Sequence, residues 1–223
     1  MASPQLDSAS ASERSVYSQH SSSPAPRVWR RDAFDSRVRL PLPVLPSLRG
    51  DRIVLLIRDE TARDAGQVRM INIAAFEQPD EADLVDALRA GCPEVVSLVA
   101  ELDGRVVGHI LFSPVTLPAG ERTLQGMGLA PMAVLPEHQR DGIGARLVED
   151  GLARLEQSGC PFVIVLGHPG YYPRFGFEPA SAHAITCQWE VPDEAFMVRI
   201  LDPEATAGAP GVARYRPEFD AVV

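Results

Sequence analysis

Short runs of apolar and β-branched residues mark the strands of this chain. They predict strands at 53–57, 95–100, 105–112, 128–135 and 162–166. The last run is apolar at every position, which is typical of a strand buried on both faces of a sheet. Asp103-Gly104 supplies the positive φ that a two-residue turn requires, so we expect the second and third strands to form a hairpin.

Apolar residues recur at helical spacing in three other segments. The first helix is expected to follow Asp64, which can cap it. Its apolar positions fall mainly on one side: Val68, Ile71, Ile73, Ala74 and Phe76. A second, short helix is predicted at 82–88. A third begins after Gly142 and ends at Ser158-Gly159, where glycine supplies a C-terminal stop.

Two connections carry further expectations. Residues 116–122 are polar and contain glycine and proline, which predicts a loop. Pro131 interrupts the strand at 128–135, and because proline has no backbone N–H, a bulge is expected there. This strand, the glycine-rich turn, the third helix and the strand at 162–166 form a βαβ unit, which makes the two strands parallel.

The chain divides into three parts by composition. Residues 1–49 are rich in serine and proline and poor in large apolar residues, which predicts a disordered extension. Residues 50–180 carry the strand and helix pattern of a folded domain. Residues 181–223 are expected to complete that domain with a sheet edge, from strand-like pieces at 185–187 and 196–201, and a terminal tail.

Charge and composition exclude several classes of function. The 223 residues carry a net charge of −9, which argues against a nucleic-acid groove, and no apolar run is long enough to span a membrane. All 21 basic residues are arginine, so the chemistry of a P-loop lysine or of a Schiff base is excluded. Cys92, Cys160 and Cys187 lack disulfide or zinc spacing, and we expect a cytoplasmic protein without a metal.

The turn at 139–144 is the segment most suited to binding a ligand. It follows a strand and opens a helix, so successive backbone N–H groups can meet an anion at the helix N-terminus. Gly142 and Gly144 let a phosphate approach the backbone, and Arg140 can add a charged donor. A bare G-x-G is also compatible with an ordinary helix start.

Two motifs in this order resemble a known family. Gln139-x-x-Gly142-x-Gly144, which opens the helix, resembles the acetyl-CoA-binding motif Q/R-x-x-G-x-G/A of the GNAT N-acetyltransferase superfamily. Tyr172-x-x-x-Gly176-Phe177 resembles the Y-x-x-x-G-F segment of that family. The segments 166–172, 81–89 and 191–196 are similar to its YhbS-like branch of predicted acetyltransferases.

The resemblance implies a fold. It is α/β, often classed α+β: a mixed central sheet with helices on both faces and a splayed pair of parallel strands that forms the acetyl-CoA cleft. The cofactor-binding residues that it implies are Met132, Ala133, Val134, Gln139, Arg140, Asp141, Gly142, Ile143, Gly144 and Ala145. In that arrangement an N–H near Val134 polarises the thioester carbonyl.

The resemblance also implies that Tyr172 lies near the sulfur of coenzyme A, where its phenol can protonate the leaving thiolate. Packing in the core is the alternative role for Tyr172, and Tyr171 is interpreted as a packing residue. Glu101 and His109 are candidates for the base, and a chain of water molecules would serve as well. Many family members have asparagine shortly after the strand at 162–166, whereas this chain has His168 nearby and no asparagine there.

The leading hypothesis is therefore an N-acetyltransferase that transfers acetyl from acetyl-CoA to a primary amine by direct attack in a ternary complex. A catalytically silent acyl-CoA sensor on the same fold is the alternative, and a nucleotide-binding regulator with the same anion loop is a third possibility. Small amines, antibiotics, peptides and proteins all stay open as acceptors. The expected partners are acetyl-CoA and an amine, with neither nucleic acid nor membrane, and the chain is either a monomer or a homodimer.

Overall fold

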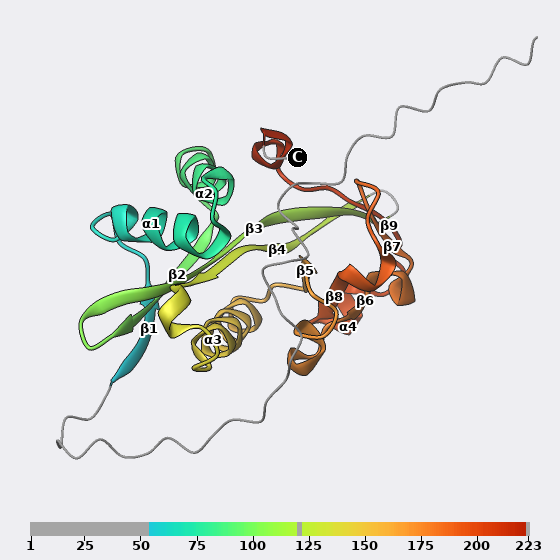
Figure 1. The fold of residues 1–223 in the computed structure, drawn as a ribbon. Helices are drawn as coiled ribbons and strands as arrows, with labels where there is room; N and C mark the ends of the chain where they lie inside the picture. The colour runs from blue at the N-terminus through green and yellow to red at the C-terminus, as the bar shows by residue number, and fades with distance from the viewer. Residues whose placement is uncertain (1–53, 120–121, 222–223) are drawn as a thin grey trace, which may run out of the picture.

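A computed structural model describes residues 54–119 and 122–221 of the chain (Figure 1). The segment 1–49, for which disorder was predicted, lies outside the described residues. The longer strands are β1 (Leu55–Asp59), β2 (Val96–Leu102), β3 (Arg105–Ala119), β4 (Arg122–Val134), β5 (Phe162–Leu166) and β8 (Phe196–Ile200), and the short ones are β6 (Glu178–Pro179), β7 (Ile185–Cys187) and β9 (Gly211–Ala213). The α-helices are α1 (Ala65–Phe76), α2 (Asp80–Gly91), α3 (Ile143–Gln157) and α4 (Pro203–Thr206).

Seven strands form one mixed sheet in the order β1-β2-β3-β4-β5-β8-β6, while β7 and β9 pair in a small second sheet. Within the large sheet, β4 and β5 are the parallel neighbours, as the βαβ pattern predicted, and the other neighbours are antiparallel. Because β8 lies between β5 and β6, the C-terminal part of the chain contributes an inner strand of the sheet and not only its edge.

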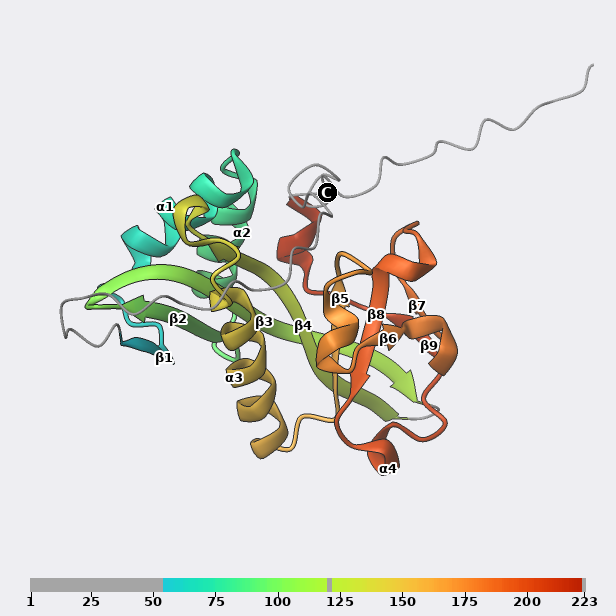
Figure 2. The same ribbon diagram turned by 60° about the horizontal axis from the view of Figure 1, so that its bottom comes forward.

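Helices cover both faces of the sheet (Figure 1). On one face α1 and α2 pack on a cluster that includes Leu111 and Ala133. On the other face α3 packs through Leu147 on Ile110 and Phe112. Figure 2 looks onto the α3 face, with β5, β8 and β6 to one side of the helix. The mixed α/β fold with helices on both faces is confirmed.

The hairpin of β2 and β3 is confirmed at its turn. Asp103 and Gly104 both have positive φ, 48° and 82°, as a type I′ turn requires. The loop predicted at 116–122 is wrong, because β3 runs to Ala119 and β4 begins at Arg122. Cross-strand pairing that continues to Ala119 and Arg122 stabilises extended backbone there despite the glycine and proline content. Thr116 also exchanges two backbone hydrogen bonds with Arg214.

The local chemistry of the helices follows the sequence in part. The helix dipole of α2 is stabilised at both ends, by three acidic residues in the first turn and by Arg89 in the last turn. The third helix ends as predicted, with Gly159 at a φ of 78° just beyond Ser158.

The first helix differs from the prediction in two ways. Asp64 stands at the N-cap position of α1, but its side chain does not cap the helix; it accepts hydrogen bonds from Arg58 and Thr61 instead. The Arg58 guanidinium thereby holds the pKa of Asp64 well below its usual range. The buried side of α1 includes Asn72, whereas Ala74 is exposed.

The end of the described C-terminal segment packs against the body of the domain. A 3-10 helix at Pro217–Ala221 places Phe219, only 4% exposed, in the cluster beneath α1 and α2. The rings of Trp189, Tyr215 and Phe219 pack one against the next there, with centroids 5.0 and 5.1 Å apart. Aromatic burial of this kind fixes the chain end to the body of the domain.

Candidate functional site

The parallel strands β4 and β5 pair over a short distance and then separate. Met127, Gly128 and Leu129 pair with Val163, Ile164 and Val165, and the pairing ends there. Although β4 continues to Val134, that last segment keeps β3 as its partner. A strand pair that separates in the middle of a sheet exposes backbone groups on the inner edges, as in the splayed pair expected from the sequence.

The register shows which backbone groups face the opening. Leu135 N donates to Val107 O at 2.9 Å, so this is a hydrogen-bonded antiparallel pair. Residues alternate along such a ladder, which means that Val134 and Met132 stand in non-hydrogen-bonded pairs, opposite Gly108 and Ile110. Their N–H and C=O groups therefore point away from β3, toward the side on which the pairing with β5 has ended.

A register shift precedes this open segment, as the position of Pro131 predicted. Ile110 pairs with Met132 and Phe112 with Leu129, so Ala130 and Pro131 both lie opposite Leu111. The extra residue is a β-bulge, and the Ala130–Pro131 peptide bond within it is cis. The bulge re-aims the last part of β4 just where its pairing with β5 has ended.

The turn between β4 and α3 presents backbone donors without a side-chain cap. Gly142, at a φ of 83°, is the N-cap residue of α3, and no side chain caps the helix there. The intrahelical ladder starts with Arg146 N donating to Gly142 O at 3.1 Å, so the N–H groups of Ile143, Gly144 and Ala145 have no partner within the helix. Donors and helix dipole together favour an anion at this place.

Gln139 lies differently from the other residues of the turn. Its backbone N–H donates to Pro136 O at 3.3 Å, which closes a 3-10 turn, and its side-chain amide donates to Val134 O at 3.1 Å. Gln139 thus ties the turn to the open end of β4. Arg140, exposed and at a φ of 70°, follows directly and begins the part of the turn that faces outward.

Three of the elements singled out by the sequence meet at Gly144. A Cβ built on this glycine would lie 3.0 Å from the hydroxyl oxygen of Tyr171 and 3.6 Å from the sulfur of Met132. The first turn of α3, the open segment of β4 and the tyrosine pair are therefore neighbours in space. The sequence interpretation treated Tyr171 as packing alone, whereas its hydroxyl reaches the start of α3.

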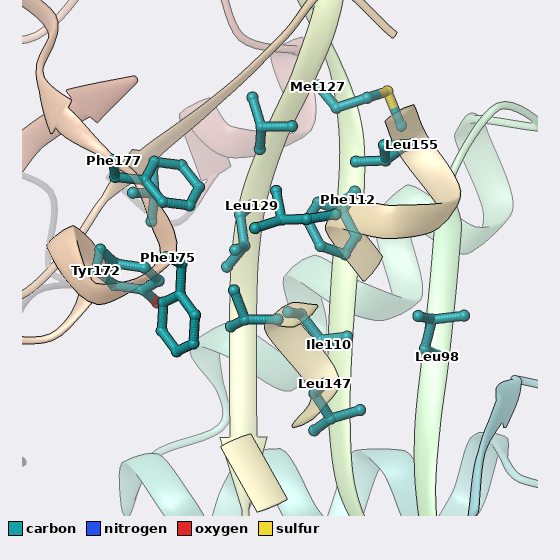
Figure 3. Packing of buried hydrophobic residues seen from close by; sticks show 14 of the residues in the cluster. Leu98, Ile110, Phe112, Met127, Leu129, Leu147, Leu155, Tyr172, Phe175 and Phe177 are labelled. Carbon is teal, nitrogen blue, oxygen red and sulfur yellow. The ribbon is translucent and has the colours of Figure 1, made fainter. Parts of the chain in front are cut away.

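Tyr172 occupies a different environment from Tyr171. Its ring lies edge-on to Tyr171 and Phe177, with centroids 5.1 and 5.7 Å away, and a Cβ on Gly167 would collide with it. Figure 3 shows Tyr172 and Phe177 on one side of Leu129, and Phe112 on the other. Burial raises the pKa of Tyr172 far above that of a free phenol, so this group is protonated at neutral pH.

Neither of the two bases suggested by the sequence is free to take a proton. Glu101 accepts a hydrogen bond from Arg58 Nε at 2.8 Å in a half-buried ion pair. His109 is fully buried, and burial, with a smaller effect of Arg89, lowers its pKa to about 3. Its two ring nitrogens already have partners, Ser97 at 3.0 Å and Asn72 at 3.2 Å.

The sequence analysis missed the polar group around His109. Glu60 and Ser97 lie next to it from the β1–α1 connection and from β2, and Asn72 approaches it from α1. A lone polar residue among apolar positions, such as Asn72 at helical spacing with Val68, was the one available signal. Nothing local in the sequence links these residues, which lie as much as 49 positions apart (109 minus 60).

The remaining side chains named in the sequence analysis have structural roles or lie at the surface. His168 is exposed, and its Nδ1 accepts a hydrogen bond from Gly170 N at 3.1 Å. Over residues 54–119 and 122–221 no group of three or more His, Cys, Asp or Glu side chains could hold a metal ion. Across the same residues, no helix has both the length and the apolar character needed to cross a bilayer.

Comparison with known proteins identifies related sequences and structures. A family model described as "Acetyltransferase (GNAT) domain" matches residues 57–180. The uncharacterized N-acetyltransferase YhbS of Escherichia coli K12 is 37% identical over 167 residues, covering 74% of this chain and 99% of the relative.

Two of the solved structures that resemble the chain contain a ligand. The structure of YhbS from E. coli in complex with CoA matches with a TM-score of 0.72 and 36% identity, over 77% of this chain and 95% of that one. A GNAT family acetyltransferase from Brucella melitensis in complex with acetyl-CoA matches with a TM-score of 0.63 and 37% identity, over 75% and 99% of the two chains.

Proposed function

Because the chain belongs to the GNAT acetyltransferase family, we propose that it transfers the acetyl group of acetyl-CoA to a primary amine in a ternary complex. The observation that carries the proposal is the meeting of two sets of backbone donors at one place. The uncapped first turn of α3 suits a diphosphate, and the open edge of β4 suits the amide-bearing pantetheine arm.

The donor-binding residues then follow from the geometry. We assign the diphosphate to the backbone of residues 140–145, with Arg140 as the basic side chain within the turn. We assign the pantetheine amides to the outward N–H and C=O groups of Met132, which pair with the ligand as they would with another strand, and the thioester carbonyl to the outward N–H of Val134. Tyr171, beside Gly144 and Met132, lies where the two parts of the ligand join.

The transfer itself requires no covalent intermediate. The lone pair of the neutral amine attacks the thioester carbonyl carbon, the carbon–sulfur bond breaks, and the nitrogen loses one proton while the thiolate gains one. The products are an N-substituted acetamide and free CoA. The Val134 N–H, which points into the opening, is the group that would stabilise the developing oxyanion.

The two protons are handled by different groups. Tyr172 is our assignment for the acid, because burial keeps its phenol protonated at neutral pH. Water is our assignment for the base, since Glu101 is paired with Arg58 and both nitrogens of His109 are already hydrogen-bonded. Because Tyr172 donates its proton to the sulfur as the carbon–sulfur bond breaks, coenzyme A leaves as a neutral thiol. The activation barrier is then lower than it would be for the departure of a free thiolate.

Isothermal titration with acetyl-CoA, followed by a thiol-release assay with a panel of primary amines, tests the proposal. We expect binding in the micromolar range and release of CoA that depends on the amine. A folded preparation that does not bind acetyl-CoA at millimolar concentration contradicts the donor assignment. A preparation that binds but releases no CoA with any amine favours the non-catalytic sensor instead.

A further inference from the structure

A chain of hydrogen-bonded side chains runs beneath α1 on the face of the sheet opposite to α3. It begins at Glu60, whose carboxylate accepts a hydrogen bond from the Ser97 hydroxyl and forms an ion pair with Arg89. Ser97 in turn contacts His109 Nε2 at 3.0 Å, and His109 Nδ1 contacts Asn72 Nδ2 at 3.2 Å. The acyl-transfer steps proposed above use none of these side chains.

The donors and acceptors in this chain can be assigned one by one. The single hydroxyl proton of Ser97 goes to Glu60, so Ser97 Oγ accepts the proton of His109 Nε2. His109 is then the Nε2–H tautomer, and its Nδ1 accepts from the side-chain amide of Asn72. The second N–H of that amide donates to Val68 O at 2.8 Å.

One atom of Asn72 is left without a partner. Its side-chain carbonyl oxygen, Oδ1, is buried and accepts no hydrogen bond, although both amide protons are used. Buried polar atoms are nearly always satisfied, so an orphaned acceptor in a network that is otherwise complete points to a partner that binds from outside. The missing partner has to be an N–H or O–H donor.

The position of Asn72 connects this acceptor to the reaction. Its neighbour His109 stands directly opposite Ala133 in the register of β3 and β4, one residue from Val134. On this face of the sheet, α1 covers two β4 residues with small side chains, Ala130 and Ala133. Asn72 therefore lies over the segment of β4 whose other edge we assign to the thioester.

We propose that Asn72 Oδ1 accepts a hydrogen bond from the N–H of the acceptor amine and so orients its lone pair toward the thioester carbonyl. The proposal rests on the proposed function and names the residue that binds its second substrate. The amide takes up no proton; it only positions the nucleophile.

An amide suits this task better than a carboxylate. A negative charge beside the amine would favour the ammonium form, which has no lone pair to attack with. A neutral carbonyl accepts from either form and leaves the amine free to deprotonate. Since Oδ1 is buried beneath α1, the proposal requires that α1 move away from the sheet for the amine to reach it.

Steady-state kinetics of Asn72→Ala test the assignment, with ethylamine, benzylamine and the dipeptide Ala-Ala as probe amines. For the probe that the wild-type enzyme acetylates fastest, we expect kcat/KM to fall about 10- to 100-fold, since the bond strengthens as positive charge develops on nitrogen. The Kd for acetyl-CoA should stay within about twofold, because the side chain of Asn72 bonds to Val68 and His109 and not to the backbone groups assigned to the donor.

Ser97→Ala is the matched control. It breaks the same network on the far side of His109 and does not touch Asn72, so it should lower stability and leave kcat/KM for the amine within about twofold. An unchanged kcat/KM in Asn72→Ala overturns the proposal and leaves Oδ1 a structural atom or a site for buried water. Equal losses in both variants overturn it too, because the effect then comes from the placement of α1.

Asn72→Asp keeps the test decisive if Asn72→Ala does not fold. It retains an acceptor at Oδ1 but adds a charge that favours the ammonium form of the bound amine, so the rise of kcat with pH should move to higher pH by about one unit. The titratable groups joined to this position by hydrogen bonds are His109 and, through Ser97, Glu60 with its ion-pair partner Arg89; Glu81, also buried, lies on α2, which packs against α1. An unmoved profile refutes the contact. A wild-type enzyme that binds acetyl-CoA and acetylates no probe refutes the proposed function, and the contact with it.

Discussion

Replacing Gly142 by alanine separates the strain of the turn from its role in binding. Gly142 has a φ of 83°, and a Cβ there would meet nothing within 4 Å, so the variant suffers no steric collision. The left-handed conformation alone costs a residue with a Cβ about 1–2 kcal/mol. We expect the free energy of unfolding to fall by that amount, measured by urea denaturation.

The same strain should weaken the binding of acetyl-CoA. Relaxation of φ at residue 142 turns the neighbouring N–H groups away from the point on which they converge. The loss of one hydrogen bond to a charged phosphate costs about 1.5–3 kcal/mol, which corresponds to about a 10- to 150-fold rise in Kd. Isothermal titration measures this directly.

Gly104→Ala is the matched control, because Gly104 has a φ of 82°, also has open space around it, and lies in the β2–β3 turn. It should lose the same stability and keep the wild-type Kd. The reasoning is refuted if Gly142→Ala binds acetyl-CoA as the wild type does while losing stability. It is also refuted if Gly104→Ala weakens binding equally.

Three further predictions concern other parts of the molecule. Tyr172→Phe should lower kcat about 100-fold or more in the thiol-release assay with little change in the Kd of acetyl-CoA, whereas Tyr171→Phe should mainly change that Kd. Burial lowers the pKa of His109 to about 3 from its ordinary 6.5, so between these values the unfolded chain binds a proton that the folded chain does not. Stability should therefore rise by about 1.4 kcal/mol per pH unit on this account, and urea denaturation from pH 4.5 to 6 should show that His109→Phe removes this part of the slope. Leu147→Ala empties a fully buried position beneath α3 and should cost about 2–5 kcal/mol; a loss below 1 kcal/mol would contradict the packing on Phe112.

Local patterns were sufficient wherever one segment determines its own structure. The five apolar residues of β5, the Asp103-Gly104 turn and the glycine that ends α3 were all predicted from the sequence. Each depends on the conformational preference or the burial of a few consecutive residues. The parallel arrangement of β4 and β5 was predicted from their connection, because two strands joined by a single helix ordinarily run parallel in one sheet, with a right-handed crossover.

The errors came from contacts that the local pattern of residue types does not reveal. Asp64 has the residue type of a helix cap, but Arg58 supplies two hydrogen bonds to its carboxylate, and that pairing prevailed over the cap. The segment at 116–122 has the composition of a loop, but β3 and β4 pair along it, and Thr116 also pairs with Arg214, almost a hundred residues later. The contact between Asn72 and His109 was missed because Asn72 is a single polar residue in an apolar helical pattern, and the two residues become neighbours only when α1 packs on the sheet.

The open end of β4 explains why chemistry is expected at this place in the sheet. Backbone N–H and C=O groups inside a protein need partners, and a strand in the middle of a sheet ordinarily finds them on both sides. From Ala130 onward β4 has β3 on one side, while its pairing with β5 on the other side has stopped at Leu129 and β5 itself ends at Leu166. Gln139 satisfies one of the outward groups, the carbonyl of Val134. The outward N–H groups of Met132 and Val134 face the opening, where a ligand with alternating amide groups can complete the ladder. A bulge that interrupts pairing therefore creates, a few residues later, a site that favours an extended amide-bearing substrate over a compact one.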